Sequence, residues 1–94
     1  MTRPIKRRFI GFNPSTTYFK PRAVPLSLLK EVEIGVDEME TLRLCDYKGL
    51  SQIKAAKKMK ISQSTLQRIL YSARRKTSEA LAEGKAIKIT KNYK

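Results

Sequence analysis

The stretch SQIKAAKKMKISQSTLQRIL, residues 51–70, contains two helical patterns separated by a short polar break. Ser51 and Ser62 are each suited to begin a helix, because a serine hydroxyl accepts a hydrogen bond from a free N–H of the first turn. Five apolar residues between and beyond them can form one joint core: Ala55, Met59, Ile61, Leu66 and Ile69. The small Ala56 would let the two helices approach closely. This layout predicts a helix-turn-helix motif over about residues 51–70.

The turn of this motif contains Lys60 where glycine is usual. That position often requires a left-handed backbone, which costs a residue with a Cβ about 1 kcal/mol. We expect Lys60 to adopt the strained conformation and to contact a phosphate. The alternative is a turn of slightly different geometry.

Helical patterns extend to both sides of the motif. Upstream, a helix is predicted from about Val36 to Tyr47, with acidic residues in its first turn and Met39, Leu42 and Cys45 on one face. Gly49 suits its left-handed end. Downstream, the helix that begins after Ser62 is predicted to continue over about residues 63–83 and to end at Gly84.

Two short segments that flank the helices alternate charged and apolar residues: EVEI at 31–34 and KAIKI at 85–89. If they pair, Val32 and Ile34 share a buried face with Ile87 and Ile89. Glu31 and Glu33 would then face Lys85 and Lys88. Otherwise both segments are irregular flanks. The expected fold is mainly α, a three-helix domain over residues 26–90 with a small two-stranded sheet.

Residues 1–25 contain all four prolines, which exclude regular helix there. We interpret them as an extended basic arm, in which TTYFK is at most a short edge strand. Residues 91–94 form a tail. The aromatic residues Tyr18, Phe19 and Tyr71 are expected to pack in the core or at its edge.

Composition restricts the classes of function. The 94 residues, 40% of them hydrophobic, suffice for one small domain. The net charge of +13 indicates a polyanionic partner, with nucleic acid the first candidate and an anionic membrane surface the second. No apolar run could span a bilayer and no signal peptide is recognisable, so a cytoplasmic protein is expected. A role at a membrane surface is disfavoured, because no predicted helix combines a broad aromatic or leucine face with a basic one. With no histidine and only Cys45, we expect no enzyme activity, metal or cofactor.

The polar residues at the start of the third predicted helix lie opposite its apolar positions. In a recognition helix, glutamine pairs with adenine, arginine with guanine, and threonine meets a thymine methyl group. The predicted base contacts are Gln63, Ser64, Thr65, Gln67 and Arg68. The alternative is an ordinary solvated helix face.

Other polar and basic residues are suited to hold the DNA backbone. These predicted phosphate contacts are Ser51, Lys54, Lys60, Ser62, Arg74, Arg75 and Lys76. For the last three, ion pairs with Glu79 or Glu83 at helical spacing are the alternative. In the arm, Arg3, Lys6, Arg7 and Arg8 either enter a minor groove or form a solubilising tail.

Residues 42–76, LRLCDYKGLSQIKAAKKMKISQSTLQRILYSARRK, resemble the helix-turn-helix of sigma-factor region 4. The matching positions are Leu42, Leu44, Gly49, Leu50, Ser51, Ala56, Ser62, Ala73 and Arg74. Over nearly all of residues 3–89 the chain is similar to a widespread prokaryotic family of small, uncharacterised, predicted DNA-binding proteins. The motifs TYFKP, VPL, DEMETLRL, GLSQ, ILYSARRK and EGKAI carry this similarity. The chain departs from the family in Lys54, where an acidic residue is common, and in having no cysteine within residues 6–10.

The resemblance implies DNA binding by a sigma-like helix-turn-helix and does not supply a target. Together with the charge and the motif, it leads us to expect a sequence-specific protein that binds double-stranded DNA and regulates transcription. Two alternatives remain at this stage: a module that binds the transcription machinery, such as RNA polymerase, and a binder of structured RNA. A palindromic DNA site would require a homodimer, for which the long third helix and the strand edge are both candidate surfaces.

Overall fold

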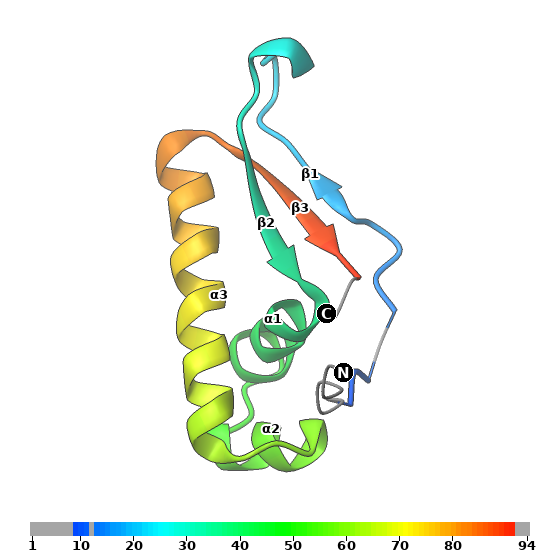
Figure 1. The fold of residues 1–94 in the computed structure, drawn as a ribbon, viewed down its shortest axis with the longest axis vertical. Helices are drawn as coiled ribbons and strands as arrows, with labels where there is room; N and C mark the ends of the chain where they lie inside the picture. Colours follow the sequence, from blue (N-terminus) through cyan, green and yellow to red (C-terminus); the bar gives the residue numbers. More distant parts are fainter. Residues whose placement is uncertain (1–8, 12, 92–94) are drawn as a thin grey trace, which may run out of the picture.

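The computed structural model describes residues 9–11 and 13–91. Within these residues the chain is mainly helical, as expected, and a small sheet packs beside the longest helix (Figure 1). The elements in chain order are β1 (Tyr18–Phe19), the 3-10 turn η1 (Leu26–Leu28), β2 (Glu31–Gly35), α1 (Val36–Thr41), the π-helical segment η2 (Leu42–Tyr47), α2 (Gln52–Met59), α3 (Gln63–Glu83) and β3 (Ala86–Thr90).

Serine caps set the beginnings of α2 and α3 as the sequence predicts. The Ser51 hydroxyl accepts a hydrogen bond from the Lys54 N–H at 3.2 Å, and the Ser62 hydroxyl accepts one from the Thr65 N–H at 3.1 Å. Each bond satisfies a backbone donor that the helix itself leaves without a partner. At the other end of α3, Gly84 takes the left-handed conformation with φ of 67°. The predicted bounds of both helices are therefore confirmed.

The first predicted helix spans α1 and continues directly into η2. Met39 packs against the sheet cluster and Cys45 against the helical cluster, but both, like Leu42, are only half-buried. The fully buried positions are Val36, Glu40, Thr41 and Leu44. The π-helical turns contain more residues than α-helical turns, so a face with regular helical spacing does not stay aligned through η2.

A buried ion pair explains why the polar Glu40 can lie inside. Its carboxylate accepts hydrogen bonds from Arg43 at 2.7 and 3.0 Å and from the backbone N–H of Gly11 at 2.8 Å. Burial of a carboxylate is tolerated when a cation and further donors satisfy it. Glu40 therefore attaches the N-terminal segment to the helical part of the molecule.

The sheet has three strands in the order β1-β3-β2, one more than predicted. The expected pairing is confirmed where β2 runs parallel to β3, with Val32 opposite Ile87 and Ile34 opposite Ile89. Glu33 lies opposite Lys88 as expected. Lys85 does not face Glu31 because it precedes β3, and its amine instead lies 2.6 Å from Glu79 and 3.1 Å from Glu83.

The additional strand is β1, which pairs antiparallel with the free side of β3. Tyr18 lies opposite Lys88 and Phe19 opposite Ile87, and the Ile89 N–H donates to the Thr17 carbonyl at 2.8 Å. The expectation that this segment is at most a short edge strand is confirmed. Part of the proline-containing N-terminal region thus belongs to the folded sheet.

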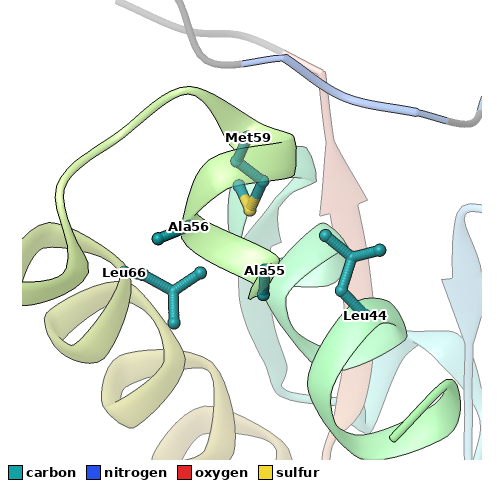
Figure 2. Packing of buried hydrophobic residues seen from close by; sticks show 5 residues of the cluster. All are labelled: Leu44, Ala55, Ala56, Met59 and Leu66. Atoms are coloured by element: carbon teal, nitrogen blue, oxygen red, sulfur yellow. The ribbon is translucent and has the colours of Figure 1, made fainter. Parts of the chain in front are cut away.

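The helices meet in one compact hydrophobic cluster. Its buried members are Leu44, Ala55, Ala56, Met59 and Leu66, which converge from η2, α2 and α3 (Figure 2). Ile61 packs at its margin as predicted. The prediction for Ile69 is wrong, because it is only half-buried and lies outside the cluster. The next residue, Leu70, is almost completely buried. A second cluster of Val32, Ile34 and Ala80 joins α3 to the sheet.

Candidate nucleic-acid interface

The first two turns of α3 present polar side chains away from the core. Leu66 and Leu70 point inward and are almost completely buried, whereas four predicted base contacts are exposed: Gln63, Ser64, Gln67 and Arg68. Because the helix repeats every 3.6 residues, Ser64 and Arg68 lie on the side opposite Leu66 and Leu70, and Gln67 lies at the flank. Gln63 is the first residue of α3 and is exposed at the end of the helix. The structure thus brings these residues together on one accessible surface.

Thr65, the fifth predicted base contact, takes part in the helix cap instead. It is half-buried, its N–H donates to the Ser62 hydroxyl, and its own hydroxyl accepts from Ser62 at 2.9 Å. Those hydrogen bonds direct its side chain toward the start of α3. Thr65 therefore lies beside the exposed surface and is less accessible than its neighbours.

The turn between α2 and α3 has the strained geometry that the sequence predicts. Lys60 has φ of 59° and ψ of 44°, which is left-handed. Its N–H closes α2 on the carbonyls of Ala56 and Lys57, and the Ile61 N–H also bonds to Ala56 at 3.1 Å. The Lys60 side chain is exposed. Because the bend is tight, α3 begins immediately beside the end of α2.

The N-terminal segment lies across this turn. The Phe9 N–H donates to the Met59 carbonyl at 3.0 Å, and the Lys60 amine lies 5.7 Å from the centre of the Phe9 ring. Ile10 packs against the helical cluster. The predicted arm contacts Arg3, Lys6, Arg7 and Arg8 lie outside the described residues.

Two of the three basic residues at positions 74–76 have acidic partners within the protein. The Arg74 guanidinium binds both carboxylate oxygens of Asp46 in η2, at 2.7 and 3.1 Å, and this holds the pKa of Asp46 below its ordinary value. Lys76 lies 3.1 Å from Glu38 in α1. These ion pairs join α3 to η2 and α1, and neither uses Glu79 or Glu83, the partners that the sequence offers at helical spacing.

Glu38 organises a small polar network at the start of α1. Besides Lys76, its carboxylate accepts hydrogen bonds from the Ser72 hydroxyl at 2.6 Å and from the Gly35 N–H at 3.0 Å. It therefore closes the first turn of α1 and fixes the middle of α3 at the same time. This network determines which face of α3 remains accessible.

The other predicted backbone contacts are distributed around the motif. Lys54 and Arg75 are exposed, while the hydroxyls of Ser51 and Ser62 are used as helix caps. Every charged residue between Tyr47 and Ser78 is basic. These are Lys48, Lys54, Lys57, Lys58, Lys60, Arg68, Arg74, Arg75 and Lys76. The end of the molecule formed by α2 and the start of α3 therefore carries positive charge with no acidic residue interspersed along the chain.

One exposed residue on this surface was assigned wrongly from the sequence. Tyr71, expected in the core or at its edge, is 66% exposed on the outer side of α3. Its position, three and four residues beyond Arg68 and Gln67, could have indicated this. Phe19 is likewise about half exposed, on the edge strand β1.

The described residues contain no group of three or more His, Cys, Asp or Glu side chains that could hold a metal ion. Burial raises the pKa of the Cys45 thiol, which disfavours the reactive thiolate form. Among the same residues, no helix is long and apolar enough to cross a bilayer.

The fold and surface define a small, basic, mainly helical protein with a capped helix pair at one end. The chain belongs to the family described as Protein of unknown function DUF134, whose family model matches residues 1–93. It is 51% identical over 89 residues to a UPF0251 protein of Dehalococcoides mccartyi, covering 95% of this chain and 76% of that protein. It is 48% identical over 95 residues to a UPF0251 protein of Caldanaerobacter subterraneus subsp. tengcongensis, covering 100% of this chain and 80% of the relative. No solved structure matches the chain.

Proposed function

We propose that this protein binds double-stranded DNA sequence-specifically and regulates transcription. In this proposal α2, the Lys60 turn and α3 form a helix-turn-helix like that of sigma-factor region 4. The start of α3 enters the major groove, and the cations around it hold the DNA backbone.

The observation that carries the proposal is the polar, exposed start of α3 at the basic end of the molecule. Gln63, Gln67 and Arg68 carry the amide and guanidinium groups that pair with adenine and guanine edges. Their rigid helix is fixed from behind by Leu66 and Leu70. A surface with this chemistry on an ordered element is suited to read base edges rather than only to attract phosphates.

In the proposal, the surrounding cations bind phosphates and so position the protein on the DNA. Lys54 lies on the accessible side of α2, Lys60 at the turn and Arg75 further along α3, and all three side chains are exposed. Each can neutralise a phosphate without first breaking an ion pair with another described residue, unlike Arg74 and Lys76. Neutralised phosphates release counterions, so this contribution to affinity depends on salt.

Two substitutions separate base reading from backbone binding. Preferred sequences are first selected from a random duplex pool, and the affinities for a selected and a random duplex are then measured by fluorescence anisotropy. We expect Arg68→Ala to lose about 1–3 kcal/mol of discrimination between the two duplexes. Arg75→Ala, the matched loss of an exposed arginine, should weaken both duplexes equally.

The same titrations contain the outcomes that contradict the proposal. Equal losses on both duplexes for Arg68→Ala would remove the base-reading assignment. If the wild-type protein fails to bind any duplex at low salt, DNA binding is wrong and a protein-interaction module is favoured. Stronger competition by structured RNA than by duplex DNA would instead favour an RNA-binding function.

A further inference from the structure

Tyr71 occupies the middle of the outward face of α3, one turn beyond the predicted base contacts. Its side chain is 66% exposed, while Leu70 and Ala73 on either side of it in sequence are buried. Within the described part of the chain, its hydroxyl forms no hydrogen bond. An isolated exposed aromatic is common on protein surfaces, so its significance depends on its neighbours.

Those neighbours form a continuous stripe along α3. Ser64, Gln67, Arg68, Tyr71 and Arg75 are all exposed and recur three or four residues apart. At a rise of 1.5 Å per residue the stripe is about 16 Å long. Tyr71 lies at its centre line, with Arg68 one turn before it and Arg75 one turn after it.

Two of the cations that follow Tyr71 on α3 are held in ion pairs within the protein. Arg74 is bound to Asp46 in η2, and Lys76 is bound to Glu38 in α1. The outward face beyond Arg68 therefore presents an aromatic ring before it presents Arg75. An aromatic ring is a poor phosphate ligand, but it offers apolar surface that a thymine methyl group can contact in the major groove.

We infer that Tyr71 is a specificity-determining residue whose ring packs against a thymine methyl group in the major groove. The inference rests on the proposed DNA-binding function and extends it, because base reading then continues one helical turn past Arg68. α3 would lie along the groove for the length of the stripe, and the cations at positions 74 and 76 would remain in their intramolecular ion pairs.

The test compares Tyr71→Ala with Tyr71→Phe, which keeps the ring and removes the hydroxyl. Duplex sites are selected from a random pool for each protein, and affinities are measured for the selected duplex and a random one. We expect the wild type and Tyr71→Phe to select the same sequence. Tyr71→Ala should lose the preference for thymine at one position and bind the wild-type site about tenfold more weakly. Tyr47→Ala is the matched control, because Tyr47 is a tyrosine that is 81% exposed on η2, away from the stripe.

Removal of the methyl group from the DNA gives an independent readout. Replacing the thymine at that position by deoxyuridine should weaken wild type and Tyr71→Phe severalfold and leave the affinity of Tyr71→Ala unchanged. The inference is overturned if Tyr71→Ala retains the wild-type sequence preference, or if Tyr71→Phe weakens all duplexes as Tyr71→Ala does, since the hydroxyl would then bind a phosphate. Failure of the wild-type protein to bind any duplex would overturn the proposed function itself, which distinguishes the two failures.

Discussion

Lys60 combines a strained backbone with an exposed cationic side chain at the turn between α2 and α3. A left-handed conformation costs a residue with a Cβ about 1 kcal/mol, and glycine would remove that cost. Lys60 also places its amine over the Phe9 ring, a contact that contributes little at an exposed site. Lys60 thus occupies a position where the local backbone conformation favours glycine.

Substitution at the turn measures this strain. We expect Lys60→Gly to raise the free energy of unfolding by about 0.5 kcal/mol, the relief of strain being partly offset by the lost ring contact. The control is Lys58→Gly, since Lys58 lies within right-handed α2 and the same change there should destabilise by about 1 kcal/mol. Urea denaturation of the two variants provides the comparison. An equal destabilisation by both would contradict the left-handed assignment of Lys60.

Among the elements, α3 depends on α1 and η2 for its orientation. The Asp46–Arg74 ion pair attaches its middle to η2, the Glu38 network attaches it to α1, and Ala80 attaches its far end to the sheet. The exposed face of α3 is therefore a consequence of these contacts as well as of its own sequence.

The pH dependence of stability tests the Asp46–Arg74 pair. The pKa of Asp46 is lower in the folded than in the unfolded protein, because Arg74 stabilises the carboxylate. This stabilisation is present above the unfolded pKa of about 4 and is lost as the pH falls through the lower folded pKa. Since the Asp46 and Arg74 side chains are 40% and 52% exposed, we expect it to be below about 1 kcal/mol.

In thermal or urea unfolding, Asp46→Asn should therefore be less stable than wild type at pH 7, and the difference should shrink toward pH 3. Arg74→Met should reproduce the effect at pH 7. Arg75→Met, which removes the neighbouring exposed cation, should leave the pH dependence almost unchanged. A difference between Asp46→Asn and wild type that is constant over this range would show that the pair does not form in solution.

At the scale of elements, the features predicted from sequence are those with local causes. Ser51, Ser62 and Gly84 determine helix ends through hydrogen bonds and backbone conformation within a few residues, so α2 and α3 are correctly bounded. The π-helical geometry of η2 has no such local signal. The incomplete burial of Ile69 also has no local signal, because Ile69 and Leu70 are both apolar and only the packing of α3 against other elements separates them.

In the candidate site, too, features with local causes were predicted from the sequence and features with nonlocal causes were not. The exposure of Ser64, Gln67 and Arg68 follows from their spacing relative to Leu66, and the structure exposes these three and Gln63 as expected. The intramolecular partners of Arg74 and Lys76 could not be predicted, because Asp46 and Glu38 are 28 and 38 residues away in sequence. Tyr71 was missed because residue type suggested burial, although its helical position indicated exposure.

Over the whole molecule, basic residues are found throughout the described fold, whereas acidic residues are absent from α2 and the first half of α3. The stretch from Tyr47 to Ser78 contains no acidic residue, and Glu31, Glu33, Glu79 and Glu83 lie in β2 and the last turns of α3. In Figure 1, α2 and the start of α3 form one end, and the connection between β1 and β2 lies at the opposite end. A polyanion should therefore approach the α2 end, and net charge alone should not determine its affinity.

The salt dependence of DNA binding distinguishes a directed surface from a merely basic protein. If the α2 end neutralises about six phosphates, log K should fall with log salt concentration at a slope near −5. Lys54→Gln combined with Lys58→Gln removes two exposed cations one turn apart on α2, and we expect the slope to become less steep by about 2. Lys20→Gln combined with Lys30→Gln makes the same change in net charge in the connection between β1 and β2, where it should leave the slope nearly unchanged. Equal effects of the two double substitutions, measured by anisotropy titration on random duplex, would mean that total charge rather than the α2 end attracts the DNA.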